Sequence, residues 1–188
     1  ASSISKNSMS IQVEAITKTY GTQKALNNIS FSIHTGEIVG FLGPNGAGKT
    51  TTISILCGLL NYDSGRIIIN GMQLEKKYRK IREVIGLVPQ EIALYDSLSA
   101  RENLRFIGEM YGIRGKELSK RIDDCLEVVG LSRNGHKQIR TYSGGMKRRL
   151  ELARGLITQP RVLFLDEPTQ GLDPQNRENI WEYIRTLK

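Results

Sequence analysis

Alternation of apolar and polar residues marks the beginning of the chain as β-structure. Residues 11–20 alternate in this way and residues 29–34 alternate again, which predicts two half-buried strands. The sequence EIVGFLG, residues 37–43, is almost entirely apolar and predicts a buried strand that ends in glycine. Short apolar runs at residues 66–70, 85–89 and 161–168 predict three further strands.

Helical spacing dominates the middle of the chain. Residues 51–60 predict a helix that follows the sequence GPNGAGKT, and the region from residue 97 to 131 is helical throughout. Ser99 followed by Glu102 predicts a capping box at the start of this region. One stripe of it is expected to face the core, and this stripe consists of Leu118, Ile122, Leu126 and Val129.

The last segment is also predicted to be a helix. Asp173 is its expected N-cap and Pro174 its first helical residue. Its inner face is predicted to contain Ile180, Ile184 and Leu187. Strands, a glycine loop followed by a helix, and a later apolar strand together predict an α/β core with a parallel sheet, into which the helical middle third is inserted.

Composition adds few constraints. The 188 residues suffice for one domain, and the net charge of +8 favours anionic partners. The longest apolar runs are far shorter than the roughly 20 residues of a membrane helix, so a membrane would be reached through a partner. Cys57 and Cys125 lie in apolar helical patterns and are expected to be core thiols. Residues 1–8 resemble an expression scar or a disordered start.

The sequence GPNGAGKT, residues 43–50, matches the phosphate-binding pattern G-x-x-x-x-G-K-[ST] without a gap. Its glycines let successive N–H groups face phosphate oxygens, and the following helix adds its positive dipole end. Lys49 is expected to reach the β- and γ-phosphates, and the Thr50 hydroxyl to bind Mg²⁺. The alternative is a chance glycine turn.

Two acids follow the apolar run VLFL. A strand buried on both faces has no reason to end in Asp166 and Glu167 unless a metal or a reaction uses them. Asp166 is therefore expected in the Mg²⁺ shell, and Glu167 is placed to orient or deprotonate an attacking water. The alternative is an exposed acid pair at a strand end.

The sequence TYSGGMKRRLELARG, residues 141–155, predicts a helix that begins near Ser143. The free N–H groups at its start, with bare backbone at Gly144 and Gly145, suit an anion. Met146, Leu150 and Ala153 are expected to face inward. The basic run of residues 147–149 is interpreted mainly as the solvated side of this helix.

Five motifs in a fixed order now resemble a known family, the ATP-binding cassette (ABC) ATPases. They are GPNGAGKT, LVPQ, YSGGM, VLFLDEP and GLDP, and the resemblance extends from about Val13 to the end of the chain. It implies a P-loop NTPase (RecA-like) core with an N-terminal antiparallel β subdomain and an inserted α-helical subdomain. It also implies that residues 9–90 and 156–188 form the core with the β subdomain, and residues 91–155 the helical subdomain with the signature.

The resemblance assigns roles to individual residues. Tyr20 resembles the aromatic residue that stacks on adenine, Gln90 the glutamine that touches Mg²⁺ and water, and Asp173 the aspartate that crosses between subunits. Each has a plainer alternative, namely a strand-end tyrosine, a polar strand end and a helix cap. The implied catalytic residues are Glu167, Gln90 and Lys49, and the implied metal ligands are Thr50, Gln90 and Asp166. The implied ATP-binding residues are Tyr20, Gly43, Pro44, Asn45, Gly46, Ala47, Gly48, Lys49, Thr50, Thr51, Ser143, Gly144, Gly145 and Asp173.

The resemblance also implies partners. In this family two cassettes pack head to tail around two ATP molecules, each held between one phosphate loop and the other protomer's signature. Tyr142 and Met146 replace the ends of the commoner LSGGQ, and this form is similar to daunorubicin-resistance-like exporters. Integral membrane permease subunits would then contact the segment EIALYDSLS on the inner face of the cell membrane. A soluble cassette ATPase acting on DNA or ribosomes is the alternative, although no nucleic acid is expected for the exporter.

A switch histidine that the resemblance implies is missing from the sequence. Family members carry it roughly thirty residues past the catalytic glutamate, whereas His34 and His136 both precede Glu167. The chain is therefore expected to be C-terminally truncated. We expect these residues alone to bind nucleotide but to hydrolyse it poorly.

Replacement of the signature serine tests the role that its position implies. Ser143→Arg in the full-length protein should leave ATP binding largely intact, because the phosphate loop is untouched. It should abolish ATP-driven dimer closure, since a long cation would occupy the place of the phosphate contact. Nucleotide titration and analytical ultracentrifugation with ATP measure the two properties, and normal dimer closure would contradict the assignment.

Overall fold

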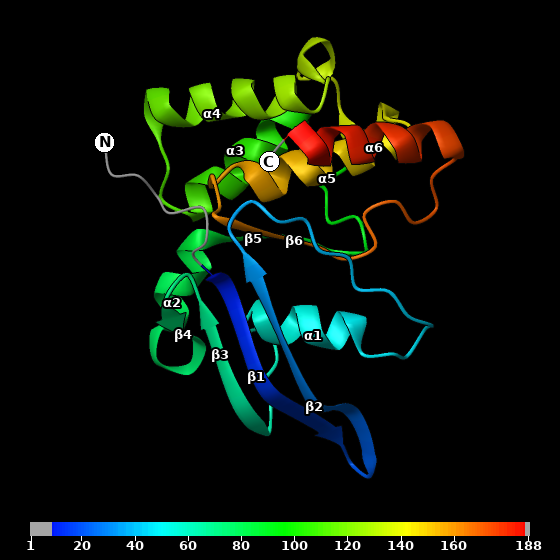
Figure 1. The fold of residues 1–188 in the computed structure, drawn as a ribbon. Coiled ribbons are helices and arrows are strands. Elements are labelled where there is room, and N and C mark those ends of the chain that lie inside the picture. The colour runs from blue at the N-terminus through cyan, green and yellow to red at the C-terminus, as the bar shows by residue number, and fades with distance from the viewer. Residues whose placement is uncertain (1–8, 187–188) are drawn as a thin grey trace. The chain divides into compact units, whose positions relative to one another are not determined.

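The computed structural model describes residues 9–186 of the chain. These residues form two compact units, one ending at Ile85 and the other beginning at Gly86. Figure 1 shows the elements of both. The expectation for residues 1–8 lies outside the described residues, and the predicted division into core and helical subdomain stays a prediction.

The first unit contains a four-stranded sheet. Its strands are β1 (Met9–Tyr20), β2 (Gln23–His34), β3 (Ser64–Ile69) and β4 (Met72–Gln73), in the order β2-β1-β3-β4 (Figure 1). Each neighbouring pair is antiparallel, which confirms the predicted antiparallel β subdomain and the strands at residues 11–20, 29–34 and 66–70. Alternation decides which side chains are buried, since Ile11, Val13, Ile67 and Ile69 are all inside.

Two helices accompany this sheet. Helix α1 (Lys49–Leu56) follows the glycine loop and contacts β2, but it ends four residues before the predicted limit at residue 60. Helix α2 (Leu74–Val84) was not predicted, because Lys and Arg obscure its apolar stripe. Leu74 and Ile81 are its buried residues, and its cations lie on the solvated side.

The prediction of a buried strand at residues 37–43 is wrong. No strand is assigned there, and Leu42 is 96% exposed while Ile38 is 51% exposed. A strand requires a neighbour that pairs with its N–H and C=O groups. No strand among residues 9–186 pairs with this segment. Hydrophobicity identified an apolar run, but it carries no information about whether a partner strand is at hand.

The second unit is mainly helical. It contains α3 (Ala100–Met110), α4 (Gly115–Val128), α5 (Gly144–Leu156) and α6 (Pro174–Thr186), with short 3₁₀ turns η1 (Ser132–Asn134) and η2 (Ile139–Thr141) (Figure 1). Strands β5 (Ile85–Val88) and β6 (Val162–Leu165) form a two-stranded sheet, and the first residue of β5 closes the first unit. The strands predicted at residues 85–89 and 161–168 are thus confirmed.

The capping box is confirmed as well. The Glu102 N–H donates to Ser99 Oγ at 3.2 Å, and the Ser99 N–H donates to Glu102 Oε2 at 2.7 Å. These bonds hold the pKa of Glu102 below its ordinary value. Helix α3 therefore begins at the residue that the pattern predicts, because two of its otherwise unsatisfied N-terminal groups are paired.

One apolar core holds the second unit together. The predicted stripe of α4 lies inside it, with Ile122, Leu126 and Val129 fully buried and Leu118 almost so. Helices α3, α4 and α5 pack on one another around this stripe. Cys125 is part of the same core, and burial raises the pKa of its thiol to about 12, as expected for a packed, unreactive residue. Cys57 is likewise buried, in the first unit.

The remaining core predictions concern α5 and α6. Leu150 and Ala153 of α5 are fully buried, and Ile180 and Ile184 of α6 lie inside, as predicted. Leu187 lies outside the described residues. Within residues 9–186, no helix has both the length and the apolar character to cross a membrane.

Truncation of a core side chain tests this packing. Ile122→Ala should lower the free energy of unfolding by about 2–5 kcal/mol, because the surrounding side chains cannot close the cavity fully. Lys120→Ala on the exposed side of α4 is the control and should change it by no more than about 0.5 kcal/mol. Trp181, the only tryptophan of the sequence, lies in α6 and reports urea unfolding of the second unit by fluorescence. Equal effects of the two substitutions would contradict the assigned core.

Candidate nucleotide-binding site

Lys49 is held across the glycine loop of the first unit. It is the first residue of α1, and its Nζ donates to the carbonyl oxygens of Gly43 at 2.7 Å and Pro44 at 3.0 Å. The side chain therefore bends back over the loop, so that its ammonium lies beside the loop backbone. This is the placement that a lysine needs to meet phosphate oxygens bound by the same backbone.

The backbone of the loop turns through two glycines in the left-handed region. Gly46 has φ 83° and Gly48 has φ 85°, values that residues with a Cβ seldom adopt. The turn brings the loop directly into the first turn of α1, whose Thr52 N–H and hydroxyl both donate to the Gly48 carbonyl at 2.8 Å. The exposed loop and the N-terminus of α1 are thus contiguous, as an anion site at a helix start requires.

Gly48 is also constrained by its neighbours. A Cβ at this position would lie 2.6 Å from Leu26 Cδ2 and 2.8 Å from the backbone oxygen of Ala25. Strand β2 therefore fixes the end of the loop by direct contact, and only glycine fits there. At Gly46, by contrast, a Cβ would meet nothing within 4 Å.

Tyr20, at the end of β1, presents an open ring. Its side chain is 50% exposed, and Lys18 Nζ lies 5.4 Å from the ring centroid. Stacking on a base requires an exposed aromatic face. The Lys18 ammonium makes a cation–π contact with the Tyr20 ring. The stacking role stays a prediction.

In the second unit the ends of β5 and β6 bring the predicted polar residues together. The Asp166 N–H donates to the Val88 carbonyl at 2.9 Å, which aligns the loop after β6 with the loop after β5. Asp166 is buried, and Gln90 Nε2 donates to Gln170 Oε1 at 2.8 Å. Gln90, Asp166 and Glu167 thus belong to two adjoining loops of one unit.

Glu167 has an unusual backbone. Its φ is 46°, in the left-handed region that a non-glycine residue rarely occupies. Such conformations persist only when their surroundings impose them, and they are concentrated at functional sites. Four other non-glycine residues also have a positive φ, namely Ala15, Asn28, Asn70 and Gln159, and Glu167 is the one acidic residue among the five.

Mg²⁺ fits the donors of the chain only if substrate phosphates and water supply the rest of its ligands. No group of three or more His, Cys, Asp or Glu side chains suited to a metal occurs in the described part of the chain. Mg²⁺ is commonly bound by one or two carboxylates together with substrate phosphates and water. Within the second unit, an amide at Gln90 and a carboxylate at Asp166 are donors of the kind that such a shell uses.

The start of α5 is capped by the signature serine. The Met146 N–H donates to Ser143 Oγ at 3.2 Å, which confirms the predicted helix start. Tyr142, just before it, is 7% exposed and donates its hydroxyl to the Asn134 carbonyl at 2.8 Å. Burial raises the pKa of this tyrosine. The tyrosine that departs from the common signature is therefore an anchor for the loop.

The two signature glycines have different surroundings. A Cβ on Gly144 would meet nothing within 4 Å, so this face is open to a ligand. A Cβ on Gly145 would lie 2.6 Å from Asn176 Oδ1 of α6. The second glycine thus permits a close approach of two helices, which the sequence reasoning had attributed to the anion alone.

Asp173 caps α6, as predicted. Its Oδ1 accepts from the Asn176 N–H at 3.0 Å and its Oδ2 from Asn176 Nδ2 at 2.6 Å. These hydrogen bonds hold the pKa of Asp173 below its ordinary value. Asp173 therefore positions the same asparagine that packs against Gly145.

The interpretation of residues 147–149 as a mainly solvated face is wrong. Arg148 is only 4% exposed, Arg149 is half-buried, and Lys147 Nζ pairs with Asp96 Oδ1 at 2.7 Å. Helix α5 is enclosed on several sides, so its polar residues are also buried. Burial lowers the pKa of Arg148, while the carboxylates of Glu151 and Asp166 act in the opposite direction.

Arg148 and Glu151 are functional candidates that the sequence reasoning missed. Glu151 is fully buried, and its Oε1 accepts from the Ala93 N–H at 2.6 Å, three residues after Gln90. The one available signal was their spacing. They stand three positions apart, on a stretch of the helix that also holds the apolar Leu150 and Leu152, and charges buried beside apolar side chains are costly unless paired.

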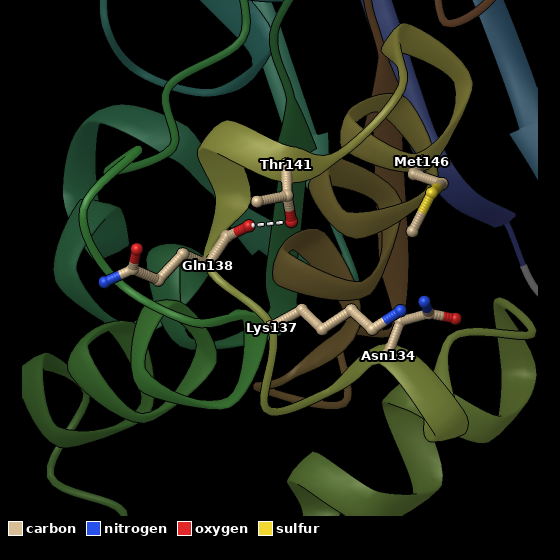
Figure 2. Close-up of a pocket in the computed structure, with 5 residues that line it drawn as sticks. All are labelled: Asn134, Lys137, Gln138, Thr141 and Met146. Carbon is tan, nitrogen blue, oxygen red and sulfur yellow. Dashed lines mark hydrogen bonds between the residues drawn. The ribbon is translucent and has the colours of Figure 1, made fainter.

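A pocket of about 470 Å³ lies beside the first turn of α5. Most of its lining side chains are polar (Figure 2), and Thr141 Oγ1 donates to the Gln138 carbonyl at 2.7 Å. The lining residues are Asn134, Lys137, Gln138, Thr141 and Met146. The pocket therefore lies next to the signature, residues 142–146, and hydrogen-bonding side chains line it.

These features coincide with one known family. The family model described as "ABC transporter" matches residues 26–170, which span the glycine loop, the signature and both acids. The chain belongs to the ABC transporter family, and its fold is that of an ABC ATPase.

Individual relatives place it more closely. The chain is 49% identical over 177 residues to the linearmycin resistance ATP-binding protein LnrL of Bacillus subtilis, covering 94% of this chain and 57% of that protein. It is 44% identical to the daunorubicin resistance ATP-binding protein DrrA3 of Streptomyces coeruleorubidus, covering 94% and 56%. The resemblance to drug-resistance ATPases is thereby confirmed. The chain spans a little over half the length of these curated relatives.

Solved structures agree with the fold. CbiO1 of Clostridium perfringens, described as part of the ABC transporter complex CbiONQ, matches with a TM-score of 0.87 and 32% identity, covering 95% of this chain and 73% of that one. The ATP-binding cassette MJ0796, solved as a dimer bound to ADP and Pi, matches with a TM-score of 0.81 and 31% identity, covering 94% and 82%. The predicted α/β P-loop fold class is confirmed.

The different surroundings of Gly46 and Gly48 give a matched pair of substitutions. Gly46→Ala should cost about 1–2 kcal/mol of stability, because alanine is strained at its φ. Gly48→Ala has the same strain and should cost roughly 1–3 kcal/mol more, since its Cβ meets Leu26 and the Ala25 backbone. Hydrogen exchange of residues 49–56 measures the difference, and equal protection in both variants would contradict the described contact.

Proposed function

We propose that the chain is the ATP-binding and ATP-hydrolysing part of an ABC exporter subunit. The observation that carries this proposal is the loop of residues 43–50, where Lys49 is held over the backbone in a chain that belongs to the ABC family. The names of the two relatives refer to resistance to linearmycin and to daunorubicin. They support export of antibiotic-like compounds rather than an action on DNA or ribosomes.

The residues divide the work of hydrolysis among them. Tyr20 stacks on the adenine, while Lys49 and the N–H groups of residues 43–51 bind the phosphates. Thr50, Gln90 and Asp166 would hold Mg²⁺, which would neutralise charge on the phosphate oxygens. Glu167 orients the attacking water and accepts its proton. The left-handed backbone at Glu167 supports this role, because strain of that kind is concentrated at active sites.

A second copy of the chain completes each ATP site. The open face of Gly144 and the capped N-terminus at Ser143 suit contact with a phosphate held by the partner. Gly145 and Asp173 belong to the same contact, since Asn176 links them. The dimeric state of MJ0796, bound to ADP and Pi, supports a dimer by similarity.

Membrane permease subunits convert dimer closure into export. The segment of residues 91–99 offers them apolar side chains, with Tyr95 52% exposed and Ile92 45% exposed. CbiO1 is described as part of a transporter complex, which supports such a partnership by similarity. The protein would then lie on the cytoplasmic face of the cell membrane, held there by its permease.

Experiments on hydrolysis use the full-length protein, because the chain spans a little over half the length of its curated relatives.

The proposed roles predict that binding and hydrolysis can be separated. Glu167→Gln should lower the hydrolysis rate by about 10²- to 10⁴-fold, because proton acceptance is lost. It should leave ATP affinity nearly unchanged, since the phosphate loop is intact. Lys49→Ala should weaken ATP binding itself. Measurements of phosphate release and equilibrium nucleotide binding with both variants decide the assignment. Undiminished hydrolysis by Glu167→Gln, or undiminished binding by Lys49→Ala, would show that the assigned residue lacks its role.

A further inference from the structure

Arg148 contacts both loops that carry the proposed catalytic residues. Its Nη1 donates to the carbonyls of Pro89 at 2.7 Å and Gln90 at 3.3 Å, in the loop after β5. In the loop after β6, its Nη2 donates to the carbonyls of Asp166 at 3.1 Å and Glu167 at 3.0 Å, and its Nε to that of Pro168 at 2.7 Å. One buried side chain therefore joins the two loops by five hydrogen bonds.

The match between donors and acceptors is complete. A guanidinium has five N–H donors in a rigid plane and no acceptor, and here the side chain makes five hydrogen bonds to backbone carbonyls. A buried charge is costly unless it is fully hydrogen-bonded, so this geometry is maintained as a unit. Lysine at the same position would have three donors and no planar fork, and it could not hold both loops.

The strained backbone at Glu167 depends on the same contact. Its carbonyl oxygen accepts from Arg148 Nη2 and also from the Gln170 N–H at 3.0 Å. With φ at 46°, this residue would relax toward ordinary backbone angles if the surroundings allowed it. The two donors to one carbonyl fix the peptide that follows Glu167, and thereby hold the backbone from which its side chain extends.

Helix α5 is itself closely attached to the loop after β5. A Cβ on Gly86 would overlap the Gly155 carbonyl, so strand and helix approach at van der Waals distance only because both residues are glycines. Glu151 adds its hydrogen bond to the Ala93 N–H. The helix that carries Ser143 at its start is thus fixed to both loops along its length.

We propose that Arg148 is a positioning residue, which holds the backbones of Gln90 and Glu167 in register with the signature helix. Through this link a contact at residues 143–145 reaches the Mg²⁺-binding and water-orienting loops of the same chain. The inference rests on the proposed function, because it assigns Arg148 a role in the hydrolysis carried out by Glu167.

Arg149 provides a matched control. It is the neighbouring arginine on the same helix and is half-buried, whereas Arg148 is buried, and its Nη1 donates to the Val129 carbonyl at 3.1 Å and to the Tyr183 hydroxyl at 3.4 Å. These partners belong to the end of α4 and to α6. Arg149→Lys therefore removes a guanidinium from the same helix, as Arg148→Lys does, but it removes no hydrogen bond to either catalytic loop.

The test compares Arg148→Lys with Arg149→Lys in the full-length protein. We expect kcat of Arg148→Lys to fall by on the order of ten- to a hundredfold, because small displacements of catalytic groups have effects of that size. The affinity for ATP measured in EDTA should stay within about threefold, as expected when only transition-state interactions are lost. Arg149→Lys should retain kcat within about threefold. A kcat for Arg148→Lys near that of wild type, or an equal loss in Arg149→Lys, would overturn the proposal.

Hydrogen exchange supplies a readout that does not require hydrolysis. Arg148→Lys should accelerate exchange in peptides covering residues 88–93 and 165–171, and Arg149→Lys should not. Arg148→Gln replaces it as the test variant if the lysine variant does not fold. Unchanged exchange in both peptides would overturn the positioning role whatever the kinetics. If the wild-type protein bound but did not hydrolyse ATP, the proposed function would fail, while the exchange data would still decide whether Arg148 holds the loops.

Discussion

The burial of one guanidinium sets the architecture of the second unit. Arg148 can lie 4% exposed only because five backbone carbonyls converge on it. Those carbonyls belong to two loops that are distant in the sequence, so each loop must adopt one shape for the charge to be satisfied. The left-handed backbone at Glu167 and the alignment of the loop after β6 with Val88 are parts of that same arrangement.

The phosphate loop of the first unit is held in another way. Among the described residues of this unit, 9–85, no charged side chain is buried. The shape of the loop comes from glycines in the left-handed region and from the contact of Gly48 with β2. The lysine is then fixed by carbonyls of its own loop. An anion site of this kind needs glycine at two loop positions, here Gly46 and Gly48, and a rigid strand beside one of them, here β2 beside Gly48.

Local rules predicted the local features. Ser99 and Asp173 were identified as helix caps and Ser143 as the start of a helix, because these features depend on residues within one turn. The stripe of α4 was likewise predicted from its spacing. The motif residues of the candidate site were predicted because phosphate and metal chemistry restrict which residue types serve, and their roles stay predictions.

Features that depend on distant neighbours were missed. The apolar run at residues 37–43 was expected in a sheet, but pairing requires a second strand that periodicity does not reveal. Arg148 was interpreted as solvated, since a row of cations usually is, and its acceptors lie 18–59 residues away in the sequence. Helix α2 escaped notice because its buried face has only two residues, Leu74 and Ile81.

The contact between Gly145 and Asn176 has a consequence for how this protein can vary. The space beside Gly145 is filled by the side-chain amide of Asn176, which donates to Asp173 Oδ2, while the Asn176 backbone N–H donates to Asp173 Oδ1. A methyl group at residue 145 would require the Asn176 side chain to move or to become smaller, and its hydrogen bond to Asp173 would then be disturbed. Substitutions at Gly145 and Asn176 are therefore expected to depend on each other, although 31 positions separate the two residues.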